Sequence, residues 1–424
     1  MMDKRVRMSG PIERGWVTFA RRAFRALASG RFWEKLQRHL FGLKIVAVPL
    51  DLMMRLVTRI HPGKVVCVSF SGAIEGSPAA IADALRRKGI ADPIHLVRGD
   101  CLPSVERRGL MKARMWSLAS LYHIATAEVL IDDAQMLVSP GIPSKRPGQF
   151  YLNTWHGSLG IKRLSTANRQ ILKRIERAAR ATDLVLTNSV FEEEVFRASV
   201  FPRTPFLKIG HPRNDVFFLP PDVRTSMRDR VRAELGLSKD EHFALYGPTF
   251  RESSFFTQAD GLDFTKWARA FEDRFGGRWR ICLRLHPHDA QALAEGLFSL
   301  PENVQDLSSW ADVQELLIAA DAGITDYSSW IFDYLLGGGP GFIFAPDKAK
   351  YDAARGFCYP LEETPFPIAQ DEASLCANIR GFDAVRYAAA TKSFLARRGC
   401  YERGDAAARA VDAIERGLRL GDET

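Results

Sequence analysis

The sequence predicts an α/β protein with two domains, each built on a parallel sheet covered by helices. From residue 62 onward, short apolar runs of strand length alternate with helical stretches, a pattern typical of parallel sheets buried on both faces. The alternation is interrupted at residues 212–222, which contain three prolines, and then begins again. The 424 residues are enough for two hydrophobic cores. We therefore expect two Rossmann-like domains facing a cleft, with ligands beyond the carboxyl ends of the strands.

The first domain is expected to cover residues 61–215. A helix over residues 79–88 follows the first strand, and Ser189 with Glu192 forms a capping box that starts a helix reaching residue 198. Runs rich in β-branched and other apolar residues give the strands. These runs cover residues 65–70, 94–97, 129–132, 150–153, 184–187 and 206–209.

The second domain is expected to cover residues 216–390, and residues 391–424 are expected to form C-terminal helices. A helix over residues 223–235 opens this half of the chain. The strands then follow in the same alternating manner, and the sequence contains no internal repeat. They cover residues 243–246, 281–285, 322–325 and 341–344.

The composition is that of a globular protein, with 46% hydrophobic and 26% charged residues. The six cysteines are scattered without any paired C-x-x-C spacing. This spacing argues against a zinc cluster or a disulfide scaffold and indicates a reducing compartment. The first 30 residues lack the continuous apolar core of a signal peptide.

The net charge of +9 is concentrated in residues 1–60, which hold thirteen basic and four acidic residues. In this segment aromatic and aliphatic side chains such as Trp16 and Phe19 share helical faces, with arginines largely elsewhere. Basic helices with aromatic apolar faces suit an anionic membrane surface, although the same faces could pack on the protein's own core. The apolar run 43–57 is interrupted by charged residues and a proline, so we do not expect it to span a bilayer.

Polar clusters follow five of the expected strands at the point where each strand ends. Carboxyl ends of parallel strands meet at one edge of a sheet, so these clusters should lie on the same side of their sheets. Five such coincidences are hard to explain by packing alone. The clusters occupy residues 154–158, 210–215, 247–251, 286–288 and 325–329.

The last of these clusters resembles a seat for a phosphate group. Thr325, Ser328, Ser329 and Asp326 stand where a small apolar strand runs into a helix. A helix start offers unpaired N–H groups and the positive end of the helix dipole, and both suit an anionic oxygen. Taken alone, the turn is better explained as an ordinary capped helix.

The five clusters together resemble the CDP-glycerol glycerophosphotransferases, the teichoic-acid and capsule polyol-phosphate polymerases and primases. The resemblance runs from about residue 62 to residue 380 and rests on the order and spacing of the motifs. It implies a GT-B fold and transfer of glycerol phosphate from CDP-glycerol, or a related CDP-polyol, to a hydroxyl group with release of CMP. It implies no cofactor and no bound metal. The motifs are Thr154-Trp-His-Gly157, Gly210-His-Pro-Arg-Asn-Asp215, Gly247-Pro-Thr-Phe-Arg251, Arg284-Leu-His-Pro287 and Thr325-Asp-Tyr-Ser-Ser329.

Two histidines are the expected catalytic residues. His156 lies in the first half, where the acceptor should enter, and its ordinary pKa near neutrality suits a general base. His286 lies in the donor half, and we assign it to the pyrophosphate, as a donor to an oxygen or as an acid toward the leaving CMP. For either residue alone, a histidine hydrogen-bonded within a turn would be the more ordinary explanation.

The remaining motif residues are expected to bind substrate. Arg213 and Arg251 can each offer a planar fork to phosphate oxygens, and for Arg251 a surface ion pair is an equal alternative. Asp326 should orient the turn or a ribose. The full set of expected substrate-binding residues is Trp155, Gly157, Arg213, Asn214, Thr249, Arg251, Arg284, Ser308, Thr325, Asp326, Ser328 and Ser329.

The expected partners are the CDP-polyol donor, a polyol-phosphate or glycan acceptor that includes lipid-linked forms, and an anionic membrane at the cytoplasmic face. His211, Gly247 and the segment 361–367 depart from the family pattern, which leaves the acceptor, the polyol and the choice between primase and polymerase open. A GT-B glycosyltransferase using a nucleotide sugar is the alternative. A nucleic-acid or lipid-binding module is disfavoured, because the charge outside residues 1–60 is balanced.

Overall fold

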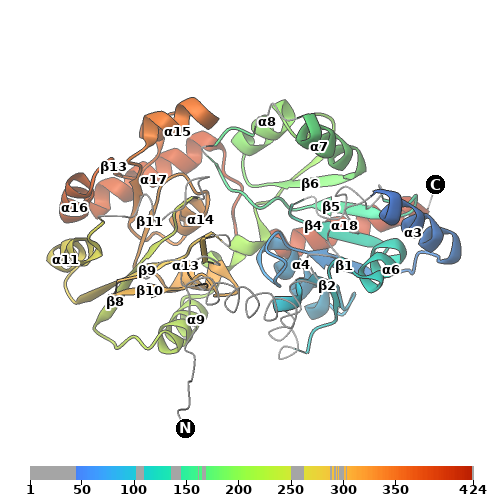
Figure 1. The fold of residues 1–424 in the computed structure, drawn as a ribbon, viewed down its shortest axis with the longest axis horizontal. Helices are drawn as coiled ribbons and strands as arrows, with labels where there is room; N and C mark the ends of the chain where they lie inside the picture. The colour runs from blue at the N-terminus through green and yellow to red at the C-terminus, as the bar shows by residue number, and fades with distance from the viewer. Residues whose placement is uncertain are drawn as a thin grey trace, which may run out of the picture.

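The chain folds into two α/β halves, each with its own parallel sheet (Figure 1). A computed structural model provides the coordinates. The residues it describes are 44–101, 109–134, 145–160, 162–164, 169–249, 262–286, 289–290, 293, 295, 300–301 and 303–422. The expected helices of residues 1–43 lie outside this set. The prediction of an α/β protein with two parallel sheets is confirmed.

The first sheet has seven parallel strands in the order β3-β2-β1-β4-β5-β6-β7. Val66 of β1 pairs with Ile94 on one side and with Leu130 on the other. All four residues of β1 are buried because helices cover both faces, which explains its unbroken apolar sequence. The strands are β1 (Val65–Val68), β2 (Ile94–Val97), β3 (Lys112–Arg114), β4 (Val129–Asp132), β5 (Phe150–Asn153), β6 (Leu184–Thr187) and β7 (Phe206–Lys208).

Two helices that are far apart in the sequence pack together on one face of this sheet. The C-terminal helix α18 (Ala406–Asp422) returns to the first half and packs against α4 (Gly76–Arg87). Its buried Val411 and Ile414 join Ile81 in one hydrophobic cluster, so the end of the chain belongs structurally to the first sheet. The other helices of this half are α3 (Lys44–Val57), η1 (Gly99–Cys101), α6 (Leu118–Thr126), α7 (Arg169–Ala181) and α8 (Val190–Ala198).

The second sheet has six parallel strands in the order β10-β9-β8-β11-β12-β13. It consists of β8 (Glu241–Tyr246), β9 (Arg278–Leu283), β10 (Val304–Asp306), β11 (Ala322–Thr325), β12 (Gly341–Phe344) and β13 (Ile368–Ala369). The helices of this half are η3 (Pro212–Phe218), α9 (Pro221–Glu234), α11 (Phe264–Phe275), α13 (Val313–Ala319), α14 (Trp330–Leu336), α15 (Lys348–Arg355), η4 (Leu361–Glu363), α16 (Glu372–Arg380) and α17 (Ala384–Arg398).

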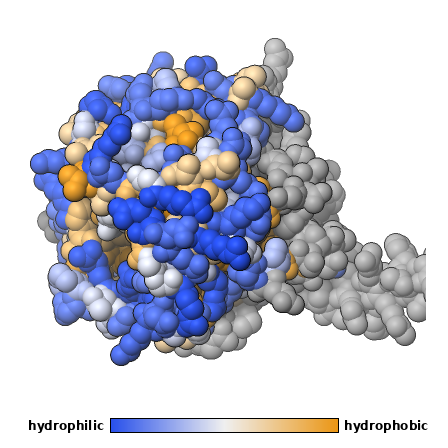
Figure 2. Space-filling model, turned by 90° about the vertical axis from the view of Figure 1, so that its left-hand side faces the viewer, coloured by the Kyte–Doolittle hydropathy of each residue, from blue (hydrophilic) through white to orange (hydrophobic). Residues whose placement is uncertain are grey.

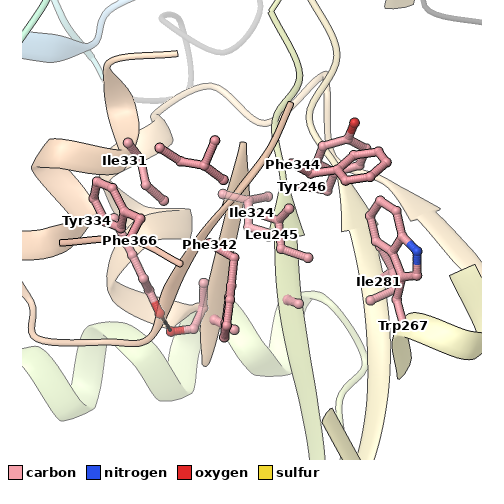
Figure 3. Packing of buried hydrophobic residues seen from close by; sticks show 14 of the residues in the cluster. Leu245, Tyr246, Trp267, Ile281, Ile324, Ile331, Tyr334, Phe342, Phe344 and Phe366 are labelled. Carbon is pink, nitrogen blue, oxygen red and sulfur yellow. Dashed lines mark hydrogen bonds between the residues drawn. The ribbon is translucent and has the colours of Figure 1, made fainter. Parts of the chain in front are cut away.

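Aromatic side chains contribute to the core around this second sheet (Figure 3). Trp267 of α11 is fully buried and meets Tyr246 and Phe344 edge to face, with ring centroids 5.2 Å apart in both pairs. Edge-to-face contacts of this kind add to the free energy gained by burying the rings. The outer surface of this half is largely hydrophilic (Figure 2). Among the described residues no helix is long and apolar enough to cross a membrane.

The segment expected to link the two halves is a packed joint. Residues 212–218 form the 3-10 helix η3, which contacts α4, α13, α14 and α18. Pro212 at its first turn has a fixed φ suited to such a start. The carboxylate of Asp215 accepts hydrogen bonds from the N–H groups of Ala406 (2.9 Å) and Ala407 (2.8 Å), which fixes the beginning of α18.

Candidate active site

A cleft of about 570 Å³ lies between the two halves, and all five strand-end clusters contribute to its walls. His156 and His286 both line it, one from each half. The parallel sheets bring the carboxyl ends of their strands to this cleft, as expected for open α/β sheets. The motif residues that line it are 155–158, Arg213, 247–249, 284–286 and 327–329.

His156 is held in one tautomer by the backbone of the neighbouring strand end. Its Nδ1 lies 2.7 Å from the carbonyl oxygen of Asp133. A carbonyl oxygen only accepts, so Nδ1 carries the proton and Nε2 keeps its lone pair. The ring is stacked between Phe70 and Trp155, with centroid distances of 5.3 and 5.0 Å. This arrangement is suited to accepting a proton at Nε2.

The surroundings of His156 favour its neutral form. Desolvation between the cleft walls lowers its pKa below the ordinary 6.5, and the hydrogen bond to Asp133 opposes this shift only in part. The positive charges of Arg213 and Lys162 lower the pKa further. The ring is nevertheless exposed toward the cleft, so a substrate can reach it. At neutral pH the imidazole is therefore available as a base.

The backbone around His156 adopts an uncommon conformation. Trp155 has a φ of 56°, in the left-handed region that bulky residues rarely occupy, and its N–H donates to Oδ1 of Asn153 at 3.0 Å. Such a residue costs roughly 1–3 kcal/mol and is concentrated at functional sites. The next glycine, Gly157, leaves no room for a side chain, because a Cβ would lie 2.9 Å from Nε1 of Trp155.

The loop after β9 places His286 on the opposite wall. The N–H of Leu285 donates to Oγ of Ser308 at 2.9 Å, so Ser308 positions this loop and does not itself line the cleft. Arg284 donates to the carbonyl of Trp310 at 2.7 Å and approaches Glu75 of the first half at 3.9 Å. Burial lowers the pKa of Arg284, while Glu75 raises it.

The residues of the 325–329 turn divide into two roles. The buried Thr325 donates its hydroxyl hydrogen to the carbonyl of Gly247 at 2.6 Å, and the Asp326 carboxylate accepts from the N–H of Thr249 at 2.9 and 3.1 Å. These two side chains hold the 247–249 loop in place. Ser328 and Ser329 line the cleft, and Ser329 makes no side-chain capping bond to α14.

Arg213 and Asn214 meet the same carboxylate, that of Asp333 on α14. Arg213 donates from Nε to Asp333 (2.8 Å) and from Nη2 to the carbonyl of Gly157 (2.6 Å). Asn214 is fully buried and donates to Asp333 (3.0 Å) and to Glu402 (2.8 Å). Arg213 lines the cleft and Asn214 does not. Arg251 lies outside the described residues.

Six charged residues that line the described part of the cleft are absent from the expected substrate-binding set: Glu75, Asp133, Lys162, Glu192, Asp333 and Arg355. Asp133 follows β4 directly, so the strand-end rule applied to that strand would have found it. Lys162 carries no sequence signal, and its Nζ donates to Oγ1 of Thr249 across the cleft at 3.3 Å. Among the residues that the structure describes, no group of three or more potential metal ligands comes together.

The segment that follows the His156 motif reaches across to the second half. The hydroxyl of Tyr359 donates to the carbonyl of Leu159, and Arg163 donates from its backbone N–H to Gly356 (3.1 Å) and from Nε to Phe357 (2.8 Å). Leu159 is buried in the hydrophobic core of the second half. Leu159 and Arg163 therefore tie the wall that carries His156 to the opposite half.

The fold and the cleft define an α/β protein with two parallel sheets, whose candidate site lies between the sheets and takes polar groups from both. The chain belongs to the CDP-Glycerol:Poly(glycerophosphate) glycerophosphotransferase family, which it matches over residues 51–416. The prediction of a CDP-glycerol glycerophosphotransferase-like enzyme is therefore confirmed.

Its relatives include enzymes of teichoic acid synthesis. The teichoic acid poly(glycerol phosphate) polymerase of Bacillus spizizenii is 26% identical over 314 residues, covering 71% of this chain and 78% of that protein. The teichoic acid ribitol-phosphate primase of the same organism is 27% identical over 316 residues, with coverage of 71% and 78%. The teichoic acid poly(glycerol phosphate) polymerase of Staphylococcus epidermidis is 30% identical over 257 residues, which span only 35% of that protein.

Solved structures of the wall teichoic acid polymerase TagF have the same fold. A TagF variant with CDPG has a TM-score of 0.74 at 26% identity, covering 92% of this chain and 97% of that one. Another TagF structure has a TM-score of 0.72 at 25% identity, covering 92% and 99%.

Proposed function

We propose that this protein transfers glycerol phosphate, or a related polyol phosphate, from CDP-glycerol to a hydroxyl of a teichoic-acid-like or capsular polymer or primer. The observation that carries this proposal is the geometry of His156, whose Nδ1 is anchored to Asp133 and whose ring faces a cleft shared with His286. Family membership and the TagF–CDPG structure support the donor.

In the proposed reaction, the acceptor oxygen attacks the donor phosphorus that carries the glycerol. The bond from that phosphorus to the oxygen bridging it to CMP breaks, and CMP leaves. The hydroxyl proton moves to Nε2 of His156, while His286, Ser328 and Ser329 contact the diphosphate oxygens. Such transfers depend mainly on positioning and electrostatics, and a base of this kind contributes roughly 10²- to 10⁴-fold in rate.

The two halves make up a GT-B-like enzyme in this proposal. The first, with residues 61–215, receives the acceptor, and the second, with residues 216–390, holds the CDP donor. The helices of residues 391–424 connect them, and the docking of α18 on the first sheet supports this connecting role. Thr325, Asp326 and Ser308 hold in place the loops whose other residues contact the substrate.

A direct test incubates the pure protein with CDP-glycerol and a glycerol phosphate oligomer and measures CMP release. We expect His156→Ala and His286→Ala each to lower the rate at least 100-fold, because base and leaving-group contacts are removed. His61→Ala, which changes an exposed histidine away from the cleft, is the control. Full activity in both cleft variants would rule out the assigned mechanism, and preference for a UDP-sugar over CDP-glycerol and CDP-ribitol would rule out the donor.

We further propose that the protein works as a peripheral enzyme at the cytoplasmic face of the membrane, held there by residues 1–60. Five apolar side chains of α3 support this proposal: Val48, Leu52, Met53, Leu56 and Val57 are exposed, the last two by 78% and 72%. Exposed apolar side chains beside a basic segment suit an anionic lipid surface.

Vesicle flotation tests the membrane proposal. The full chain should float with vesicles rich in phosphatidylglycerol, and should do so less at high salt because charge attraction is screened. The chain without residues 1–60 should stay in solution while it still binds CDP-glycerol. Equal flotation of both proteins would contradict the proposal.

A further inference from the structure

One corner of the cleft is acidic, and the proposed chemistry has not used it. This acidic corner consists of Glu75, which directly precedes α4, and Asp133, which directly follows β4. Both line the cleft from the first half. Asp133 is only 5% exposed as a whole residue, and the side chain of Glu75 is 15% exposed. Two carboxyl groups are thus held out of bulk water beside the site.

The Asp133 carboxyl group has unused hydrogen-bonding capacity. Its Oδ1 is buried and has no hydrogen-bond partner among the described residues, although the backbone N–H of Phe70 bonds to this carboxylate. A buried acceptor left without a partner is costly, so this oxygen, in a residue that lines the cleft, points to a hydrogen-bond donor on a ligand.

The electrostatics of the corner favour an uncharged hydrogen-bond donor. Burial and the nearby charges of Asp132 and Glu75 raise the pKa of Asp133, and burial likewise raises that of Glu75. The same negative field repels a phosphate group. Two cations act on the corner. Arg284 lies 3.9 Å from Glu75 and already donates to Trp310, and Arg213, which lowers the pKa of Asp133, already donates to Asp333. Neutral hydroxyl groups, which donate to carboxylates without adding charge, fit these conditions.

The position of the corner indicates which substrate supplies the hydroxyl groups. Asp133 holds His156 through its own carbonyl oxygen, so the residue that carries this carboxyl group is in direct contact with the base. The groups suited to diphosphate oxygens lie elsewhere in the cleft: Lys162, Thr249, Ser328 and Ser329. A hydroxyl bound at the acidic corner therefore belongs to the molecule whose oxygen is to be deprotonated.

We propose that Asp133 and Glu75 form a subsite for the terminal polyol unit of the acceptor, accepting hydrogen bonds from the hydroxyl next to the reacting one. The inference rests on the proposed function and names the substrate group that this corner recognises. Seating the neutral end of the acceptor here directs its reacting hydroxyl toward Nε2 of His156. It also keeps the anionic phosphodiester of the acceptor out of this corner.

The test compares Asp133→Asn and Glu75→Gln with the wild type, using a synthetic glycerol phosphate oligomer as acceptor. Asparagine can keep the bond to Phe70 through its oxygen but turns an NH2 group, which does not accept, toward the ligand. We expect the acceptor KM to rise about 10-fold or more in each variant, since each loses a carboxyl oxygen that accepts from the acceptor hydroxyl. The KM for CDP-glycerol and the kcat at saturating acceptor should stay within about threefold.

Asp83→Asn is the matched control, because it removes one exposed carboxylate from the outer face of α4. Calorimetric binding of CDP-glycerol and the thermal unfolding midpoint verify that each variant is folded. Oligomer binding in the presence of CDP gives a readout without turnover. If Asp133→Asn is unfolded, the acceptor KM and oligomer affinity of Glu75→Gln test the inference.

Three results would overturn the inference: an unchanged acceptor KM and oligomer affinity, a raised KM for CDP-glycerol alone, or a fall in kcat with a shifted pH profile. The second result would mean that the corner binds the glycerol of CDP-glycerol. The third would mean that the corner acts on the protonation or position of His156. Failure of the wild type to release CMP from CDP-glycerol would instead overturn the proposed function, and the oligomer-binding comparison would still test the corner.

Discussion

At the scale of single residues, the neutral state of His156 leads to a prediction about pH. The base must be unprotonated, so the rate should fall as the pH decreases through its folded-state pKa. Burial and nearby cations lower that pKa below 6.5. We expect kcat/KM for the acceptor to be flat at neutral pH and to decline only below pH 6.5. A pH–rate profile measures this, and an acidic limb centred above pH 6.5 would contradict the assignment.

The conformation at Trp155 and the lack of space at Gly157 belong to the same residue-scale argument. The left-handed φ of Trp155 turns the chain sharply after β5, so that the His156 ring stacks between Phe70 and Trp155. Gly157 then brings its carbonyl within 2.6 Å of Nη2 of Arg213. The local strain is offset by contacts that fix the base in place.

At the scale of elements, Arg213 connects the loop that carries His156 with helix α14. Its guanidinium Nε donates a hydrogen bond to Asp333, and its Nη2 donates one to the carbonyl of Gly157. Arg213 thereby positions the cleft walls relative to each other, whether or not it also contacts phosphate oxygens.

We predict that Arg213→Lys destabilises the protein and slows the reaction. A lysine has one ammonium group in place of the planar fork, so it can replace only one of the two contacts. Disrupting a buried pair costs about 3 kcal/mol or more, and kcat should fall about 10-fold because the base is less well positioned. Chemical unfolding and steady-state kinetics measure these effects. Arg230→Lys, at an exposed pair with Glu315, should change stability by less than about 1 kcal/mol, and equal effects of both substitutions would contradict the positioning role.

At the scale of the whole molecule, the two halves meet at a buried polar joint around Glu402. This residue lies between α17 and α18 and accepts hydrogen bonds from Asn214 (2.8 Å) and from the N–H of His211 (3.2 Å). Burial raises the pKa of Glu402 from 4.5 to about 7, although the nearby His211 acts to lower it. The folded protein therefore binds this proton more tightly than the unfolded chain.

Because of Glu402, the free energy of unfolding should depend on pH. For a raised pKa, the stabilisation is fully present below pH 4.5 and is lost as the pH rises through about 7. The shift corresponds to about 3 kcal/mol. Glu402→Gln stays neutral, so its unfolding free energy should change less between about pH 4.5 and about pH 8 than that of the wild type. Urea unfolding across this range checks the prediction, and an identical pH dependence in the variant would contradict it.

Much of the fold followed from local patterns. The strands at 94–97, 129–132, 150–153 and 184–187 have the predicted bounds, because each is a short apolar run limited by polar or turn-forming residues. Three strands were missed: β3, β10 and β13. They are two or three residues long at or near sheet edges, and Lys112 and Arg114 give β3 the composition of a loop.

The sequence by itself determined the class of fold, the family and the set of loops around the cleft, because strand periodicity and strand-end motifs are local features of the chain. Only the tertiary structure decided how the motif residues divide their work. Thr325 and Asp326 turn inward to hold a neighbouring loop, whereas Ser328 and Ser329 line the cleft. Arg213 meets Asp333, 120 residues away. Such roles depend on which side chains the two sheets bring within hydrogen-bond distance, and spacing along the chain does not encode that distance.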